Sequence, residues 1–527
     1  MGLTMTRRQA ALLLAEALVA APIVAADTRA GGADTAQAGS DKSTEGGGQP
    51  AAPVYIVLWF DTEDYILPAS DDAAMRIADF LTKNGIRATF KVVGEKARVL
   101  ERRQRTDVIA ALCRQEIGYH SNTHSQQPTP AVYESALDWE LGQEEFDRRE
   151  RPGFDDVTRI FGRPPSCYGQ PGVSWAPQAY PALKKWGVNV YLDDGPQVQL
   201  DGKPFWYGGL LNIFHIKAGQ QLEPNNDWSN LETAKADFKT LYAEISSRPP
   251  GGIVSFMFHP TQLVSEVFWD AVNFAHGANP PPSEWKAQPE NSPAKRERAF
   301  QYFEGLVTYI KSFPGVRFVT ASEAFVLCRD RAQGRAFSAQ DVAAIAGQVN
   351  SRITFQVHEG YALSASEAFS LLNSFTARFV SQGTVAAVKL DGTPYGPSST
   401  AYGVINGEAS MTIGWSQFAR TSLDTNEFLE KYQAIPNAVW FGSTAVSPEA
   451  YLLTLASVIP SLVSKGKPPD SVKILPAELG AAQWVADDSP SIWKWPIFPP
   501  GFHSAHLMEL ARLQAWTIKP AILGNPG

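Results

Sequence analysis

The chain has 527 residues, of which 44% are hydrophobic and 19% are charged, and its formal net charge is −8 at pH 7. A chain of this length exceeds one ordinary core, so we expect two or three domains. The acidic balance and the lack of a basic stripe argue against a nucleic-acid partner, because phosphate neutralisation needs clustered Lys and Arg. Three cysteines form at most one disulfide, which excludes a disulfide-rich scaffold.

The N-terminus has the layout of an export signal. Arg7 and Arg8 precede an apolar run, 10–26, that ends in small residues suited to cleavage, and the arginine pair favours the twin-arginine route. The run is too short and too interrupted to span a bilayer comfortably. We therefore expect a signal peptide over 1–26 and an exported protein, periplasmic, cell-surface or secreted, with no integral membrane span after signal removal.

Predicted structure begins after a linker. Residues 27–52 are mainly small and polar, which predicts disorder. The run 54–60 is apolar throughout, as expected for a strand that is covered on both faces. A helix with one apolar face is predicted over 71–84, with Gly85 as its stop, and a second strand over 87–93.

The alternation of helix and strand continues to about residue 330. Its further elements are a helix at 105–115, strands at 117–119, 188–192 and 252–258, a helix at 298–312 and a strand at 316–319. Repeated β-α units imply parallel strands with helices outside, in a barrel or a doubly wound sheet. We expect one domain over 53–330, with its chemistry at the carboxyl ends of the strands.

The remaining residues, 331–527, have a different texture. The segments 363–369 and 446–451 resemble each other, and each runs through a helix to a glycine, Gly383 or Gly466, and then to a short strand. A period of roughly 80 residues predicts a duplicated α+β module. Because this region holds few charged clusters, we expect a binding or packing role, with cell-wall polymer or carbohydrate as the ligand of a binding domain.

The first cluster with chemical potential directly follows the first strand. Asp61, Glu63 and Asp64 place three carboxylates within four residues. Such groups repel one another if they are buried, and a cation or a shared proton relieves the repulsion. The alternative is a solvated turn with an aspartate that caps the next helix.

Histidines form the second and third clusters. His120 and His124 are four residues apart, a spacing that predicts two imidazoles on one face of a helical turn, able to bind one metal such as zinc, cobalt, nickel or iron. The alternative is a pair of surface or capping histidines. His259 directly follows the predicted strand 252–258. An imidazole there is suited to protonating a leaving amine or alkoxide, and the alternative is a histidine that simply forms a hydrogen bond at the strand end.

In this order and at these strand ends, the clusters resemble the polysaccharide deacetylases (the NodB-homology domain, carbohydrate esterase family 4). The resemblance covers about 54–327, and its most specific part is His120-Ser121 followed by His124. It implies an α/β fold, an irregular (β/α) barrel of the polysaccharide deacetylase type. It also implies a metal-dependent hydrolase that uses a divalent metal, zinc by expectation, to deacetylate a polysaccharide or cell-wall polymer.

The same resemblance implies a role for each cluster. The first supplies Asp61 as the catalytic base and one carboxylate ligand for the metal, for which Glu63 and Asp64 compete. The two histidines of the second cluster are the other metal ligands. His259 is the general acid that protonates the departing group.

The third motif of that family departs from its pattern here. The stretch 167–172 has Gln170 where the family has an arginine beside the base. A neutral glutamine orients the base but supplies no charge, so the pKa of the base is less depressed unless Arg163 reaches in from the preceding turn. We expect Tyr168 and Gln170 to contact substrate, with a backbone N–H near Tyr168 helping to stabilise the oxyanion.

A fourth region of the resemblance lies at 191–195, and a long insert, 197–250, follows it. We expect this insert to wall the cleft. Trp206 and Trp228 are its candidate sugar platforms, and core packing is the alternative for each.

Two other functions stay open. One is an amidohydrolase that acts on a small cyclic amide or imide with the same scaffold, because such relatives also have altered first and third motifs. The other is a non-catalytic carbohydrate-binding surface protein. The joint presence of Asp61, His120, His124 and His259 argues against the second of these.

Overall fold

The computed structural model describes residues 52–193, 195–214, 222–223, 227–384, 387–407 and 411–524. Residues 51–527 form one compact unit. The expected signal peptide and all but the last residue of the expected linker lie outside the described residues. Within the described part of the chain, no helix has the length and apolar character that crossing a membrane requires.

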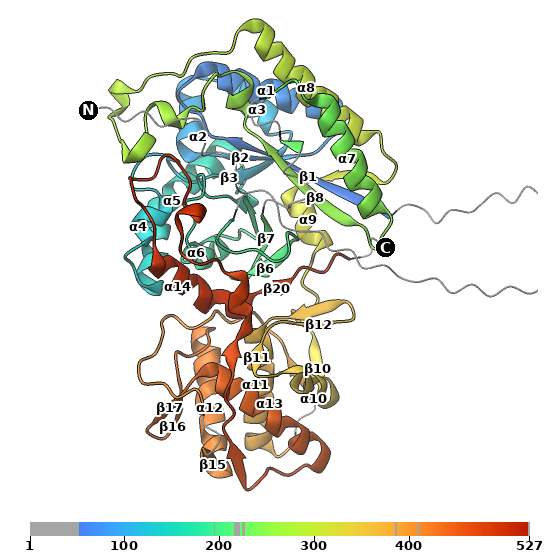
Figure 1. Cartoon of the computed structure of the whole chain (residues 1–527), viewed down its shortest axis with the longest axis vertical. Helices are drawn as coiled ribbons and strands as arrows, with labels where there is room; N and C mark the ends of the chain where they lie inside the picture. The colour runs from blue at the N-terminus through green and yellow to red at the C-terminus, as the bar shows by residue number, and fades with distance from the viewer. Residues whose placement is uncertain are drawn as a thin grey trace, which may run out of the picture. The chain divides into compact units, whose positions relative to one another are not determined.

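A ten-stranded sheet, counted over the described residues, organises the first region (Figure 1). The strands are β1 (Val54–Thr62), β2 (Thr89–Val92), β3 (Glu116–Tyr119), β4 (Cys167–Tyr168), β5 (Val190–Asp193), β6 (Phe205–Tyr207), β7 (Leu210–Phe214), β8 (Gly252–Phe258), β9 (Val316–Val319) and β20 (Lys519–Pro520). Their order is β20-β6-β7-β5-β4-β3-β2-β1-β8, and β9 pairs with β1. Pairing is parallel from β7 to β8, whereas β6 and β20 are antiparallel. Because β8 and β20 do not pair with each other among the described strands, the sheet is a curled half-barrel.

Helices alternate with these strands, as the sequence predicts. They are α1 (Pro68–Lys83), α2 (Gly94–Arg102), α3 (Thr106–Leu112), α4 (Pro130–Glu134), α5 (Trp139–Phe161), α6 (Ala179–Lys185), α7 (Leu231–Ser246), α8 (Pro293–Lys311) and α9 (Ala321–Leu327). The helix that was predicted from residue 71 begins three residues earlier, at Pro68, because proline suits the first turn, where its missing N–H costs nothing. Six of these helices have no counterpart among the predicted elements, namely α2, α4, α5, α6, α7 and α9.

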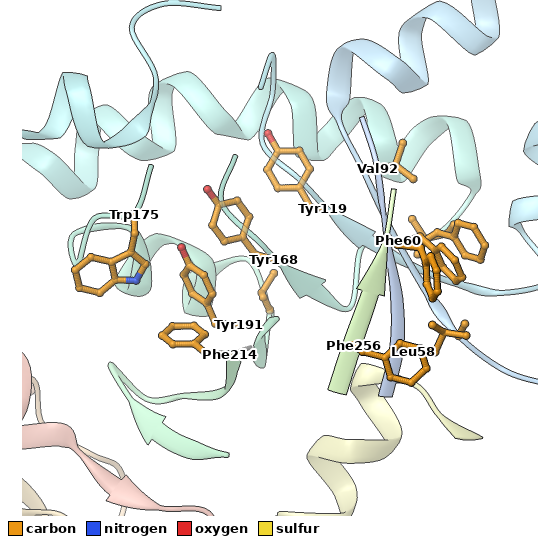
Figure 2. Packing of buried hydrophobic residues seen from close by; sticks show 14 of the residues in the cluster. Leu58, Phe60, Val92, Tyr119, Tyr168, Trp175, Tyr191, Phe214 and Phe256 are labelled. Carbon is orange, nitrogen blue, oxygen red and sulfur yellow. The ribbon is translucent and has the colours of Figure 1, made fainter. Parts of the chain in front are cut away.

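Strand β1 is buried along its whole length because each of its faces meets a different core. Leu58 and Phe60 join the cluster that also contains residues of α1 and α8, and Figure 2 shows them beside Phe256 of β8. Val57 and Trp59 point the other way and pack with residues of β5, β7 and α9. The period of two along a continuously apolar strand thus serves two cores, as expected for a parallel sheet that is covered on both sides.

A second core lies in the region after residue 331. Its elements are β10 (Ala336–Ser338), α10 (Ala339–Gln348), β11 (Arg352–Ile353), β12 (Gln356–His358), β13 (Tyr361–Leu363), α11 (Ala365–Gln382), β14 (Ala387–Lys389), β15 (Thr412–Gly414), α12 (Trp415–Tyr432), β16 (Val439–Phe441), β17 (Thr444–Val446), α13 (Pro448–Lys465), β18 (Ser471–Lys473) and β19 (Glu478–Leu479). Gly383 and Gly466 end α11 and α13 in the left-handed conformation that favours glycine.

The last stretch of the chain, which lies within the module expected over 331–527, returns to the first region. Residues 480–524, the return segment, include α14 (Ala505–Leu513) and β20, which pairs with β6. Met508 and Ala511 of α14 belong to the same buried cluster as β1 and α1. Sequence periodicity does not reveal this return, because an apolar helix face looks the same whichever core buries it.

Candidate active site

The three predicted clusters meet at the carboxyl edge of the sheet. Asp61 is the last residue but one of β1, and His120 and His259 directly follow β3 and β8. Asp61 Oδ1 lies 3.6 Å from His120 Nε2, and Asp61 Oδ2 lies 3.5 Å from His259 Nε2. The side chains of Asp61 and His120 are almost fully buried, and that of His259 is 14% exposed. Parallel strands bring their carboxyl ends to one edge, so residues almost 200 positions apart become neighbours.

Glu63 and the two histidines of the second cluster form a compact group of potential metal ligands. Glu63 Oε2 lies 2.6 Å from His124 Nε2 and 3.3 Å from His120 Nε2, and the three ligand atoms are all within 4.8 Å of one another. All three side chains are at most 2% exposed. Trp269 donates a hydrogen bond of 2.9 Å from its indole nitrogen to Glu63 Oε1, which leaves Oε2 directed at the histidines.

Hydrogen bonds at the far side of each ring orient the two histidines. His120 Nδ1 lies 3.0 Å from the carbonyl oxygen of Gly169, which only accepts, so this nitrogen carries the proton. His124 Nδ1 lies 2.6 Å from Ser125 Oγ, whose own hydroxyl donates to Asp270 Oδ2 at 3.1 Å. Both Nε2 atoms therefore present lone pairs towards Glu63, as in metal sites with a second layer of hydrogen bonds.

This donor set fits a divalent cation. His124 Nε2 is buried and makes no hydrogen bond among the described residues, although Glu63 Oε2 is close. Two imidazole lone pairs and a carboxylate oxygen that face one another in a buried site need a cation or a proton between them. Burial lowers the pKa of His124 but the Glu63 carboxylate raises it further, so the ring pKa lies above its ordinary value.

A turn, rather than the predicted helical turn, brings His120 and His124 together. No helix covers residues 120–124, and Ser121 and His124 have φ angles of 65° and 54°. The Ser121 hydroxyl accepts a hydrogen bond of 3.1 Å from the His124 backbone N–H and closes the turn. Positive φ at two non-glycine residues is strained, and such strain occurs where surrounding contacts hold a functional geometry.

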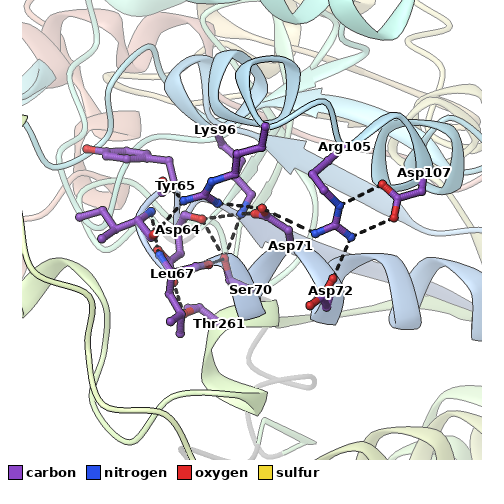
Figure 3. A network of polar contacts seen from close by, with 12 residues as sticks. Asp64, Tyr65, Leu67, Ser70, Asp71, Asp72, Lys96, Arg105, Asp107 and Thr261 are labelled. Atoms are coloured by element: carbon purple, nitrogen blue, oxygen red, sulfur yellow. Dashed lines mark hydrogen bonds and ion pairs between the residues drawn. The ribbon is translucent and has the colours of Figure 1, made fainter.

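Asp64 points away from the histidines and organises the start of α1. Its Oδ1 accepts hydrogen bonds from the backbone N–H groups of Ile66 and Leu67 at 2.9 and 3.0 Å. Its Oδ2 accepts from Thr261 Oγ1 at 2.7 Å (Figure 3), and it also accepts from Gln288 Nε2 at 2.6 Å. Of the two carboxylates that compete for the metal, the geometry thus brings Glu63, and not Asp64, to the histidines.

Lys91, a residue that sequence reasoning missed, lies beside Asp61. It is paired with Asp61 in the register of β1 and β2, its side chain is fully buried, and its Nζ lies 2.8 Å from Asp61 Oδ1. The same ammonium forms an ion pair with Asp193 Oδ2 and lies 4.2 Å from the ring centroid of Trp59. The signal was available, because a lysine inside an otherwise apolar strand is rarely buried without a charged partner.

Gln170 contacts Asp193, the other carboxylate partner of Lys91. Its Nε2 donates to the Gly172 carbonyl oxygen at 3.0 Å and lies 3.4 Å from Asp193 Oδ1. Arg163 does not replace the missing arginine, because it donates to the carbonyl oxygens of Cys113 and Gln115 instead. Lys91 therefore supplies the positive charge that the sequence suggested was absent.

The charges around Asp61 and Glu63 keep both carboxylates ionised. Burial raises the pKa of Asp61, but His120 and Lys91 lower it more, so it lies below its ordinary value. Burial also raises the pKa of Glu63, but His124 and His259 bring it well below the usual range. For Lys91, burial lowers the pKa, whereas Asp193 and Asp61 raise it above the ordinary value.

Three expected substrate-binding side chains lie in cores instead. Tyr168 is 1% exposed and packs edge to face against Tyr191 (Figure 2). Trp206 packs against Phe325 of α9, and Trp228 packs against a tyrosine of α8. Both tryptophans are at most 8% exposed, so neither offers a free face to a sugar. The N–H of Gly169, next to Tyr168, is also committed, because it donates to the Tyr119 carbonyl oxygen at 3.0 Å.

No family model matches this chain, and no curated protein matches it. Among solved structures, it is similar to a putative polysaccharide deacetylase from Mycobacterium smegmatis, with 14% identity, 52% of this chain and 92% of the other covered, and a TM-score of 0.34. It is also similar to Puue allantoinase, with 14% identity, coverage of 55% and 97%, and a TM-score of 0.35. A third is a family 4 acetyl xylan esterase from Clostridium thermocellum in complex with a cobalt ion, with 16% identity, coverage of 52% and 91%, and a TM-score of 0.26. Scores this low establish neither a family nor a function for this chain.

Proposed function

We propose that this protein is a metal-dependent hydrolase that removes acetyl groups from an extracellular or cell-wall polysaccharide. The observation that carries the proposal is that five side chains meet through contacts shorter than 4 Å. They are the carboxylate of Asp61, the potential metal ligands Glu63, His120 and His124, and a third histidine, His259. The match of the His-Ser-x-x-His motif to the polysaccharide deacetylases supports the same chemistry.

Each residue has a defined task in this proposal. Glu63, His120 and His124 would hold the cation, for which zinc suits a mixed imidazole and carboxylate set and cobalt, nickel or iron are alternatives. When bound, the cation supplies charge that polarises an acyl carbonyl and lowers the pKa of a water molecule. Asp61, kept ionised by Lys91, removes the proton of the attacking water, whose oxygen bonds to the acyl carbon. His259 gives a proton to the departing nitrogen or oxygen, so acetate and a free amine or hydroxyl are released.

Acetate release from chitooligosaccharides, peptidoglycan and acetylated xylan by the zinc-loaded chain tests this function. We expect activity on at least one of them. We also expect a loss of about a thousandfold for Asp61→Asn, the scale of a lost general base. An active Asp61→Asn variant, or no acetate release from any of the three by the wild type, contradicts the proposal.

The burial of the cluster favours a second candidate, an amidohydrolase that acts on a small cyclic amide. The proposed metal ligands are at most 2% exposed, which suits a small substrate that enters the site completely. Ring opening of hydantoin-type amides, measured beside acetate release, separates the two functions. Faster turnover of the cyclic amide would favour the second candidate.

We infer in addition that residues 336–473 are a duplicated module that retains the protein on polymer. The two halves, 336–389 and 412–473, share the order strand, helix, hairpin, helix, strand, except that the first half has β11 before its hairpin. In each half the first strand pairs with the last. An internal deletion of this module that keeps the return segment should preserve acetate release from soluble oligomers and abolish retention on insoluble chitin or peptidoglycan. Unchanged retention would contradict this role.

A further inference from the structure

The return segment places a tryptophan against the proposed metal ligand His124. The ring centroids of Trp495 and His124 are 5.6 Å apart, with the rings nearly perpendicular at 87°. Two hydrogen bonds to one backbone carbonyl hold this part of the chain. The side chain of Gln127 donates from Nε2 to the Ile497 carbonyl oxygen at 2.9 Å, and the Gly277 N–H donates to the same oxygen at 3.0 Å. A residue about 370 positions after His124 thus lies beside the site.

The loop that corresponds to the third motif is shaped to receive this indole. Gly172 has a φ of +52°, and a Cβ added there would lie 2.5 Å from ring atoms of Trp495. Only a residue without a side chain leaves room for the ring at this distance. Trp495 is therefore held between Gly172 and His124.

Trp495 differs from its neighbour Trp269, which also contacts His124, with ring centroids 5.4 Å apart. Trp269 is fully buried, and its N–H is committed to Glu63. Trp495 is only partly buried, and its N–H donates to no acceptor among the described residues. An indole usually satisfies its N–H when it is buried, so a partly exposed ring with an open donor is suited to contact a ligand.

We infer that Trp495 is a substrate-contacting residue that packs against the sugar ring bearing the acetyl group, so that the return segment completes the active site. This inference rests on the proposed function, because it assigns the ring to an acetylated sugar at the same centre. The apolar face of a sugar lies on the indole, and the indole N–H donates to a sugar hydroxyl or to the acetamide oxygen. The catalytic groups and the proposed metal ligands lie at or just after the carboxyl ends of β1, β3 and β8.

Calorimetric titration of the zinc-loaded, full-length chain tests the inference with two probes. Tetra-N-acetylchitotetraose carries sugar rings, whereas acetohydroxamate is a small metal ligand without a ring. We expect Trp495→Ala to weaken binding of the tetrasaccharide about tenfold and to leave acetohydroxamate binding and zinc content unchanged. Trp495→Phe should bind the tetrasaccharide more weakly than the wild type and more tightly than Trp495→Ala, because it keeps a ring but loses the N–H.

Trp484→Ala is the matched control, because this tryptophan of the return segment is also partly buried and stacks on Phe355, with ring centroids 4.9 Å apart. Equal tetrasaccharide binding by Trp495→Ala and Trp484→Ala overturns the inference. An equal loss for both probes also overturns it, because it would mean that Trp495 only holds His124 in place. Trp495-dependent binding without acetate release supports the inference and overturns the proposed function. Acetate release by the wild type, together with tetrasaccharide binding that Trp495→Ala leaves unchanged, supports the proposed function and overturns the inference. A wild type that neither binds the tetrasaccharide nor releases acetate overturns both.

Discussion

Two buried charge clusters lie near the carboxyl edge of the same sheet, and they differ in how fully their charges are paired. The first, which we call the α1 network, comprises Asp64, Ser70, Asp71 and Lys96 (Figure 3), together with Arg103. There the Lys96 ammonium donates to the Asp64 carbonyl oxygen at 2.5 Å, to Ser70 Oγ at 2.9 Å and to Asp71 Oδ1 at 2.5 Å, and Arg103 pairs with Asp71 Oδ2 at 2.7 Å. All three donors of the ammonium are used.

The second cluster is the candidate active site, where lone pairs from His120, His124 and Glu63 converge and His124 Nε2 makes no hydrogen bond among the described residues. The α1 network is complete as it stands, whereas the candidate site needs a further positive charge. The comparison teaches that acidic residues close together in sequence can serve opposite purposes. Glu63 and Asp64 are adjacent, but one faces the incomplete cluster and the other the side of α1.

Of the changes that test this comparison, replacing Lys91 at the candidate active site is expected to have the largest effect, and the effect is on activity. Lys91→Met leaves Asp61 and Asp193 buried without their shared cation, so the pKa of Asp61 should rise and activity should fall about a hundredfold near neutral pH. Lys91→Arg keeps the charge and should restore part of the activity. Rates measured against pH check this, and an unchanged profile for Lys91→Met would show that Lys91 does not support the base.

Breaking the α1 network should affect stability rather than turnover. Asp71→Ala leaves the buried Lys96 ammonium without its carboxylate, and we expect the free energy of unfolding to fall by about 3 kcal/mol. The kcat of the folded fraction should stay unchanged. Denaturant unfolding and kinetics on the same sample check this, and a large fall in kcat at full folding would remove the distinction between the two clusters.

The smallest expected effect is on the pH dependence of stability, and it comes from Glu134 of α4, which belongs to neither cluster. Its buried carboxyl oxygens make no hydrogen bond among the described residues. Burial raises its pKa to about 9, and Glu145 and Glu150 add to the rise. The folded pKa lies above the unfolded value of about 4.3, so stability is highest below that value and is lost as the pH rises towards 9. Glu134→Gln should therefore flatten the fall in melting temperature between pH 5 and pH 9, and an equally steep fall in the variant would contradict this assignment.

Sequence patterns were sufficient for the elements that depend on local order. The apolar runs that became β1 and β8, and the residues that end them, predicted which groups lie at the sheet edge. The choice between Glu63 and Asp64 was out of reach, because it depends on Thr261 and Gln288, which lie about 200 residues away. Local patterns also cannot say which face of a fold a side chain meets.

The same limit explains the other differences. Trp206 and Trp228 were candidate platforms because tryptophan serves both cores and binding sites, and only the packing of α8 and α9 shows that these two are core residues. Trp495 carried no signal, since the return of the chain to the first region depends on contacts of high sequence separation. Lys91 alone could have been noticed, as a charge within a buried strand.

Zinc binding by two neighbouring variants tests the central claim most directly. Equilibrium dialysis followed by metal analysis should find one zinc per wild-type chain and the same for Asp64→Asn, whose side chain is committed to α1. Glu63→Gln should bind zinc about a hundredfold more weakly, because it loses the carboxylate ligand between the two histidines. Full zinc binding by Glu63→Gln together with loss of zinc in Asp64→Asn would contradict the account.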